Sequence, residues 1–413
     1  MLAPTILLLC GVPSTPPPFT TPLVVPQINR IALTPMVDGR IDPEEWDELA
    51  AIEGGKAFFQ WQPQIMHFAA TLPPGKDLLI SADIRADGWL IGRDNLEIRL
   101  RSTATGVDVQ TRILDATAAA GPQWSEATAF QASAKAAAMP SEGGTSMELS
   151  LTDPGKLMLI KDSNRKMGLR VDVIDSAEGS HEPFLPRVMT NVSLDLDRST
   201  GLPEGMNFKP EYKGRSVVPG DRTRIRLTFN GKPDAEFRRI EVRTEGFARD
   251  VTGMTGVPFP AFDKKGRAFV DYETTVMASA SSGYRVLRAT VVDASGRESV
   301  VQSSFEIAPT IDFELVPPKI ADGRKEATTH KLVVYVRSNT VRRVEGLVSL
   351  QAPAGWEVKD GNGEAFSIYN SRGSARRVFE VTIPADARGP FPILMKAVLG
   401  AKTVDQTLWM TIP

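Results

Sequence analysis

Apolar and polar residues alternate with a period of two in many short segments of the chain. In residues 222–229 the apolar side chains fall at 225, 227 and 229, and the polar ones at 224, 226 and 228. This period places each set on one face of a β-strand, so the segment is expected to be a half-buried strand. Comparable segments predict strands at 56–61, 78–85, 95–101, 107–115, 145–151, 167–174 and 332–337.

Glycine and proline are frequent, with 33 and 31 residues, and they suit short strands joined by turns better than long helices. At 413 residues the chain has the length of roughly three domains of about 150 residues each. We therefore predict an all-β fold of three β-sandwich domains in series, at 30–198, 205–308 and 311–413. A Pro/Gly/Lys-rich passage at 199–220 is expected to be a linker or a domain edge.

Residues 37–47, with the sequence VDGRIDPEEWD, combine turn chemistry, a helix-start signal and a core aromatic. Asp38-Gly39 is a tight-turn pair, because glycine readily takes a positive φ. Asp42 can cap a short helical turn in which Pro43 needs no hydrogen-bond partner. Trp46 is then the residue that this turn presses into a core.

This segment resembles the opening D-G-x-x-D-x-x-W motif of the family 9 carbohydrate-binding modules and their DOMON-like relatives. Two later segments resemble strands of the same family: DNLEIRL at 94–100 is similar to D-x-x-E-I-x-L, and ELSL at 148–151 is similar to E-x-x-I-P. The resemblance covers roughly residues 30–195. It implies a jelly-roll or DOMON-like sandwich that binds carbohydrate.

The other two domains resemble immunoglobulin-like modules. At 283–297 a strand runs into the turn DASGR, as in the late hairpin of immunoglobulin-like and fibronectin-like domains. The segments SLQAPAGWEV at 349–358 and VFEVTIPADA at 378–387 resemble the Ig-like domain found beside catalytic modules in bacterial glycosidases. Both domains are therefore expected to be Ig-like β-sandwiches.

Charge and cysteine content bear on the partners. The 48 basic residues nearly balance the 50 acidic ones, which argues against a nucleic-acid partner. Cys10, the single cysteine, ends the apolar run 6–9 and precedes a Pro/Thr-rich stretch, a pattern similar to a bacterial lipoprotein signal. A plain secretion signal and a mis-assigned start codon are the alternatives. We expect residues 1–29 to be an export signal and tether, with Cys10 as the candidate lipidation site and membrane tether, and the protein to be at the cell surface, periplasmic or extracellular.

Metal and catalytic motifs are sparse. His67, His181 and His330 are far apart in the sequence, and none has a second ligand at zinc spacing. The densest acidic group includes Asp42 and Glu44; a capped, solvated turn accounts for it, and a structural calcium ion is the alternative. Asp94 with Glu97, and Asp195 with Asp197, are further candidates of that kind. No pair of acids is isolated as a glycosidase would need.

Sugar recognition requires flat aromatic surfaces rimmed by hydrogen-bonding groups. Trp89 follows the Asp87-Gly88 turn and is expected to be exposed, and Trp124 lies in a predicted loop. Trp61 belongs to an aromatic-rich strand and fits either a core or a binding role. Trp46 and Trp356 are assigned to cores.

These observations lead us to expect an exported, non-enzymatic protein that binds carbohydrate, such as a cell-surface glycan, through its first sandwich. It requires no cofactor apart from the structural calcium considered above. A structural or adhesive surface protein without a sugar ligand is the first alternative. A glycoside hydrolase accessory or divergent enzyme is the second.

Overall fold

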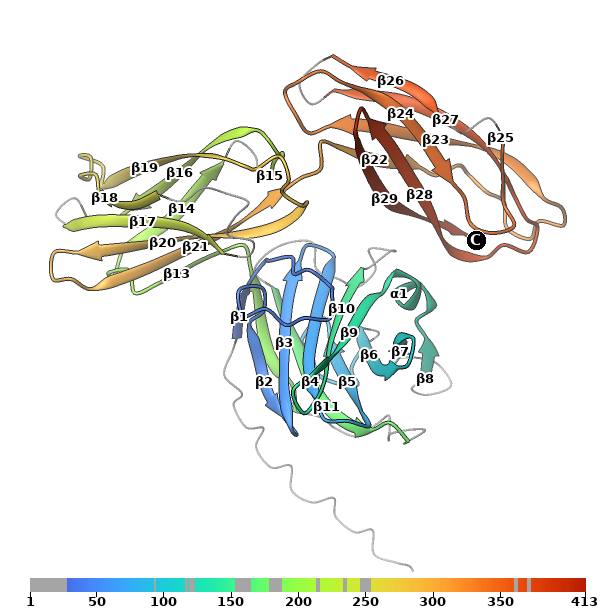
Figure 1. Cartoon of the computed structure of the whole chain (residues 1–413), viewed down its shortest axis with the longest axis horizontal. Coiled ribbons are helices and arrows are strands. Elements are labelled where there is room, and N and C mark those ends of the chain that lie inside the picture. The colour runs from blue at the N-terminus through green and yellow to red at the C-terminus, as the bar shows by residue number, and fades with distance from the viewer. Residues whose placement is uncertain are drawn as a thin grey trace, which may run out of the picture.

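The protein is an all-β chain of three β-sandwiches in a computed structural model (Figure 1). The structure describes residues 28–92, 94–115, 118, 123–152, 165–177, 188–212, 216–232, 236–245, 254–359, 363–369 and 373–413. Cys10 and His181 lie outside these residues. No helix of the described part is long and apolar enough to span a membrane.

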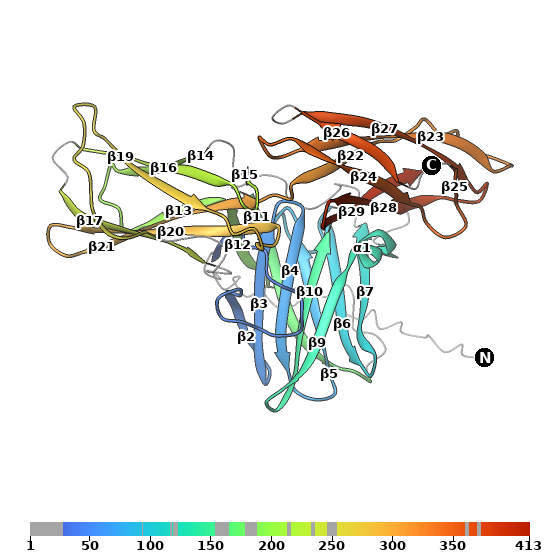
Figure 2. The same cartoon turned by 45° about the horizontal axis from the view of Figure 1, so that its top comes forward.

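The first sandwich packs a seven-stranded sheet against a five-stranded sheet. The strands β2, β3, β4, β10 and β9 form one layer in Figure 2. In spatial order the seven-stranded sheet comprises β1 (Ile28–Ile31), β12 (Thr190–Asp195), β11 (Arg165–Asp175), β5 (Lys76–Asp83), β6 (Asn95–Thr103), β7 (Gly106–Asp115) and β8 (Gln123–Glu126). The five-stranded sheet comprises β2 (Glu48–Ile52), β3 (Gly55–Gln62), β4 (Ile65–Leu72), β10 (Gly144–Thr152) and β9 (Lys135–Ser141), and α1 (Thr128–Ser133) connects β8 to β9.

Alternation along each strand explains the core between these sheets. Phe59 and Phe68 point inward from β3 and β4, and Ile80 and Ile98 point inward from β5 and β6; all four are buried. Alternation did not predict the strand β4, because both of its faces are buried. Its residues 65–70 are apolar except for His67 and therefore show no period of two.

The second sandwich begins earlier than expected. Of the two alternatives for residues 199–220, the structure has the domain edge and not the linker, since strands of that passage join both sheets of the second sandwich. One sheet comprises β13 (Asp197–Thr200), β21 (Glu298–Ile307), β20 (Gly283–Asp293), β17 (Phe237–Glu245) and β18 (Met254–Pro258), with β15 (Ser216–Val217) paired to β21. The other comprises β14 (Asn207–Tyr212), β16 (Arg222–Asn230) and β19 (Arg267–Thr275). Turn-forming residues are compatible with short strands, which is why composition was misleading here.

The third sandwich consists of two four-stranded sheets around one core. The first comprises β22 (Ile311–Val316), β23 (Thr328–Ser338), β27 (Ser374–Ile383) and β25 (Glu357–Lys359). The second comprises β26 (Glu364–Ile368), β24 (Val344–Gln351), β28 (Gly389–Leu399) and β29 (Lys402–Ile412). Trp356 is buried in this core as expected.

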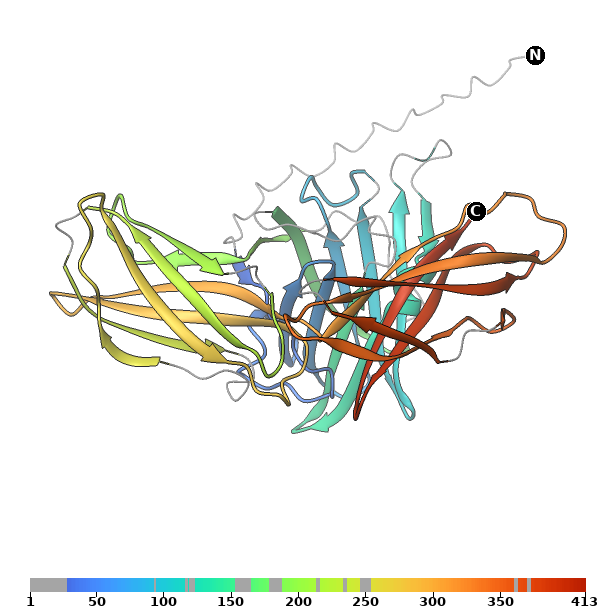
Figure 3. The same cartoon turned by 90° about the horizontal axis from the view of Figure 1, so that it is seen from above.

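Polar contacts join the first sandwich to the second, which extends away from it in Figure 3. The hydroxyl of Ser304 donates a hydrogen bond to the carbonyl oxygen of Ala32 at 2.9 Å. The backbone N–H of Tyr284 donates to Thr34 Oγ1 at 2.8 Å, and the N–H of Thr34 donates to the carbonyl of Tyr284 at 3.1 Å. A small apolar cluster, formed by Ile31, Leu33 and Val286, lies beside these contacts.

The joint between the second and third sandwiches is more polar. Arg342 forms an ion pair with Asp221 at 3.2 Å and donates a hydrogen bond to the carbonyl of Gly220 at 3.1 Å. Asn339 donates through its amide to the carbonyl of Pro309, at 3.0 Å, in the connecting segment. Both joints are thus made by specific hydrogen bonds as well as by the covalent connection.

Candidate functional site

The segment 37–47 packs on the outward face of the five-stranded sheet, where Glu148 of β10 holds it. The Oε2 atom of Glu148 accepts hydrogen bonds from the N–H groups of Asp38 at 2.8 Å and Gly39 at 2.6 Å. Its Oε1 atom accepts from the indole Nε1 of Trp46 at 2.9 Å. Glu148 and Trp46 are both buried. The motif that resembles carbohydrate-binding modules is therefore occupied by its own structural contacts.

The predicted cap is present in the same segment. Asp42 Oδ1 accepts a hydrogen bond from the N–H of Glu44 at 2.9 Å, and the N–H of Trp46 donates to the carbonyl of Asp42 at 3.2 Å. Both Asp42 and Glu44 are exposed. Within the described residues, neither belongs to the cluster of three potential metal-ligating side chains.

Glu45, in contrast, is buried beside Glu148. Burial raises the pKa of Glu45 to about 7; the hydrogen bond from the N–H of Met36 opposes this change, and the carboxylates of Glu148, Asp42 and Asp38 add to it. Burial likewise raises the pKa of Glu148. Since both oxygens of Glu148 are occupied by donors, this acidic pair has a structural explanation.

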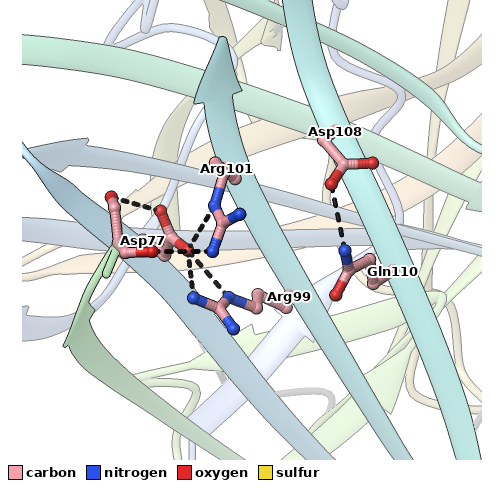
Figure 4. A network of polar contacts seen from close by, with 6 residues as sticks. Asp77, Arg99, Arg101, Asp108 and Gln110 are labelled. Carbon is pink, nitrogen blue, oxygen red and sulfur yellow. Dashed lines mark hydrogen bonds and ion pairs between the residues drawn. The ribbon is translucent and has the colours of Figure 1, made fainter. Parts of the chain in front are cut away.

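The outward face of the seven-stranded sheet is polar and largely buried. Asp77 Oδ2 accepts hydrogen bonds from Arg99 Nε at 2.7 Å and Arg101 Nε at 3.0 Å, and its Oδ1 accepts from Ser176 Oγ at 2.6 Å (Figure 4). Asp108 and Gln110 lie on the adjacent strand β7 in the same view, joined at 3.1 Å. Because the buried carboxylate is matched by two guanidinium groups, this end of the face is electrostatically satisfied.

Further along the same face, two of the predicted tryptophans meet. The ring centroids of Trp89 and Trp124 are 6.1 Å apart with a 43° tilt. The guanidinium of Arg112 lies 4.6 Å from the Trp124 centroid, and its Nε donates to Glu97 Oε1 at 2.5 Å. Glu97 is buried, whereas Trp124 is half-buried. An aromatic ring, a guanidinium and a carboxylate therefore lie at one place.

Trp89 was expected to be exposed, but the structure buries it: only 9% of its surface is accessible. The turn that carries it folds back on itself: Gly88 N–H donates to Asp83 Oδ2 at 2.8 Å, and Leu90 N–H donates to Asn95 Oδ1 at 3.0 Å. A turn signal in the sequence does not reveal this return. Trp61, at 1% exposure, lies in the core and has no surface on which a ligand could stack.

Asp94 does not lie with Glu97, the partner expected from the sequence. Glu97 pairs with Arg112, its cross-strand neighbour on β7. Asp94 instead lies with Asp83 and Asp87: one carboxylate oxygen from each of the three residues lies within 4.8 Å of the others. The signal that could have found this group is the three aspartates that bracket the turn between β5 and β6. Among the described residues, these three aspartates form a cluster that could hold a metal ion.

Among the described residues, surface hollows lie in each of the other two sandwiches. One is lined in part by Ser349, Gln351, Trp356 and Lys396 of the third sandwich. The second sandwich contributes the other, whose lining includes Glu204, Lys232, Phe237 and Asp293. Trp356 is a core residue, and Asp293 accepts hydrogen bonds within its own turn.

Comparisons with known proteins assign no family. No protein-family model and no curated protein matches the chain. Among solved structures, Salmonella alpha-2-macroglobulin reacted with methylamine has a TM-score of 0.25 and 10% identity, over 89% of this chain and 31% of that one. Escherichia coli alpha-2-macroglobulin activated by porcine elastase has a TM-score of 0.25 and 10% identity, over 90% and 44%. CBD12 from CALX1.2 has a TM-score of 0.22 and 12% identity, over 47% and 83%.

The chain thus spans under half the length of these alpha-2-macroglobulin structures. Likenesses of this size assign neither a family nor a function to it.

Proposed function

We propose that the first sandwich binds carbohydrate on the outward face of β7 and β8. The observation that carries this proposal is the grouping of half-buried Trp124 with Arg112 and Glu97. An indole offers an apolar surface to the C–H face of a pyranose, and the guanidinium of Arg112, which the buried Glu97 holds in place, can donate hydrogen bonds to its hydroxyls. Trp89 packs behind Trp124 and limits the orientations that its ring can take.

The neighbouring residue Gln110 extends the proposed site along β7. Gln110 and Arg112 lie two residues apart and so point to the same face of the sheet, and Gln110 is exposed. Its amide provides both a donor and an acceptor, as sugar hydroxyls require. Asp108 lies beside Gln110 on β7, and its carboxylate would repel an anionic ligand. The proposed ligand class is therefore a neutral or weakly charged glycan rather than a strongly anionic one.

A glycan array followed by affinity electrophoresis tests the proposal on the full chain. Trp124→Ala is expected to weaken binding at least about tenfold, because it removes the aromatic surface. Gln110→Ala is expected to weaken it less. Trp409→Ala is the matched control, as Trp409 is a half-buried tryptophan of β29 in the third sandwich. Absence of binding to any glycan, or equal loss in the control, would reject the site.

A second candidate function, a structural or adhesive surface protein, is favoured by the two hydrogen-bonded joints. Contacts such as Ser304 with Ala32 and Arg342 with Asp221 limit rotation between sandwiches, as a spacer needs. Under this function the chain is exported and tethered. Release of the protein from cells only by detergent, with a lipid on Cys10 that is lost in Cys10→Ser, supports tethering; recovery in the soluble cytosolic fraction contradicts it.

A further inference from the structure

Three aspartates surround the turn between β5 and β6. Asp83 ends β5, Asp87 lies in the turn, and Asp94 immediately precedes β6. One carboxylate oxygen from each lies within 4.8 Å of the others. Asp83 pairs with Asn95, the residue that follows Asp94, so the sheet holds the backbones of both aspartates in place; Asp87 is exposed.

Asp83 and Asp94 each use only one of their two oxygens. Asp83 Oδ2 accepts from the N–H of Gly88 at 2.8 Å, and Asp94 Oδ2 accepts from the N–H of Arg85 at 2.7 Å. The Oδ1 atoms of both residues are buried and have no hydrogen-bond partner, and the residues are only 2% and 4% exposed. A buried carboxylate oxygen without a hydrogen-bond partner is costly, so these two atoms are candidate ligands for a cation.

The charges of the cluster lead to the same conclusion. None of the ion pairs formed by the described residues involves these three aspartates. Burial raises the pKa of Asp83 and of Asp94, and the carboxylate of Asp87 adds to both changes. The N–H groups of Gly88 and Arg85 oppose them, and the charge of Arg85 also opposes the change at Asp94. A cation placed among them would offset both the desolvation and the mutual repulsion.

Backbone conformation keeps space open beside these oxygens. Gly92 has a φ of 74°, and a Cβ atom there would lie 2.9 Å from Asp94 Oδ1 and 3.6 Å from Asp87 Oδ2. Ala86 and Leu90 also have positive φ values, of 53° and 75°, which non-glycine residues rarely adopt. A strained loop that converges on three carboxylates is typical of a ligand clamp.

We propose that Asp83, Asp87 and Asp94 bind a divalent cation of the calcium type. Ca²⁺ accepts six to eight oxygen ligands in flexible geometry, and carboxylates, backbone carbonyls and water can all contribute. An irregular loop suits Ca²⁺ better than Mg²⁺, which demands near-ideal octahedral geometry. Ion binding would order the turn that carries Trp89, and through it the Trp89–Trp124 pair. The inference does not depend on carbohydrate binding.

Terbium luminescence and titration calorimetry on the full chain, stripped with EDTA, test the proposal. Tb³⁺ replaces Ca²⁺ at oxygen sites, and Trp89, two residues from Asp87, can sensitise its emission. We expect Tb³⁺ emission that decreases as Ca²⁺ displaces Tb³⁺ from the site, and one bound Ca²⁺ by calorimetry. With Ca²⁺ in excess, the melting temperature should rise by about 3 °C or more. No calorimetric heat and no melting shift with Ca²⁺, Mg²⁺ or Mn²⁺ would overturn it.

Two variants separate metal binding from simple damage to the fold. Asp87→Asn, at an exposed position, is expected to weaken Ca²⁺ binding at least tenfold. Asp94→Asn can still accept from Arg85 N–H and relieves the repulsion, so it is expected to melt no lower than wild type without Ca²⁺ and to lose the Ca²⁺-dependent rise. Glu44→Gln is the control, at another exposed acid. Wild-type affinity in Asp87→Asn, or its loss in Glu44→Gln, would reject the site.

Discussion

The indole Nε1 of Trp46 donates a hydrogen bond to Glu148 Oε1 at 2.9 Å, across 102 positions of the chain. The other carboxylate oxygen of Glu148 accepts the N–H groups of Asp38 and Gly39. One buried carboxylate in β10 thus fixes both the turn and the aromatic residue of the segment 37–47. This segment is the part of the chain that most resembles a known motif, and packing and hydrogen bonds within the fold explain its turn and its tryptophan.

Glu148→Gln is expected to lower the free energy of unfolding by about 2 to 4 kcal/mol. A glutamine amide would place its NH₂ group against either the two backbone N–H groups or the indole N–H, so a donor would face a donor. Urea denaturation monitored by tryptophan fluorescence measures the change. Glu142→Gln, at an exposed position in the hairpin before β10, should differ from wild type by less than about 0.5 kcal/mol. Equal effects in the two variants would contradict this role.

Gly39→Ala is expected to destabilise the protein by about 2 to 4 kcal/mol. Gly39 has a φ of 91°, and an added Cβ would lie 2.7 Å from Met139 Cγ and 2.9 Å from the backbone carbon of Ala138. Gly143 has a similar φ of 77° but nothing within 4 Å of an added Cβ. Gly143→Ala should therefore cost only the backbone term, about 1 to 2 kcal/mol. Chemical denaturation of both variants tests whether steric contact adds to strain.

Glu45→Gln is expected to change how stability depends on pH. The pKa of Glu45 is raised to about 7 in the folded protein, so folding takes up a proton between roughly pH 4.5 and 7. The stability that this provides is fully present below pH 4.5 and is lost as the pH rises through 7. Glutamine can still accept the hydrogen bond from Met36 and does not ionise. Relative to wild type, the variant should gain up to about 3 kcal/mol between pH 4.5 and pH 8.

Denaturation curves at several pH values measure this difference, and Glu44→Gln, at the neighbouring exposed position, should leave it near zero. A constant offset between Glu45→Gln and wild type from pH 4.5 to 8 would contradict the assignment of a buried, protonated Glu45.

Ser304→Ala is expected to weaken the joint between the first two sandwiches. The carbonyl of Ala32 would lose its buried donor, at a cost of about 1 to 3 kcal/mol. In differential scanning calorimetry the transitions of these sandwiches should then separate more than in wild type. Ser303 is a matched control, because its hydroxyl donates to Asp197 within the second sandwich. Separation of the transitions by Ser303→Ala to the same extent would show that the effect is not specific to the joint.

Local patterns account for much of the fold. The alternation in residues 222–229 predicted β16, and the segments at 95–101 and 145–151 correspond to β6 and β10. Prediction failed where the pattern was not local. The strand β4 lacks clear alternation because both of its faces are covered, and residues 199–220 contain strands despite their turn-rich composition.

The candidate sites show the same division. Trp89 and Trp124 were named individually, and the structure places them 6.1 Å apart; the burial of Trp89 was missed because the turn after it folds back on Asn95. Asp94 was assigned to Glu97 by proximity in sequence, although a strand directs residues three apart to opposite faces. Its partners, Asp83 and Asp87, come from the preceding strand and turn.

The sequence by itself determined that the chain is all-β, because side-chain alternation and turn residues act over a few positions. It also indicated the cap at Asp42 and the burial of Trp46. Only the tertiary structure decided that Glu148 holds Trp46, that Arg112 joins Glu97 and Trp124, and that three aspartates converge at one turn. The physical reason is that strand pairing and register determine which distant side chains share a face of a sheet. A shift of one residue in the register would move each of these side chains to the opposite face.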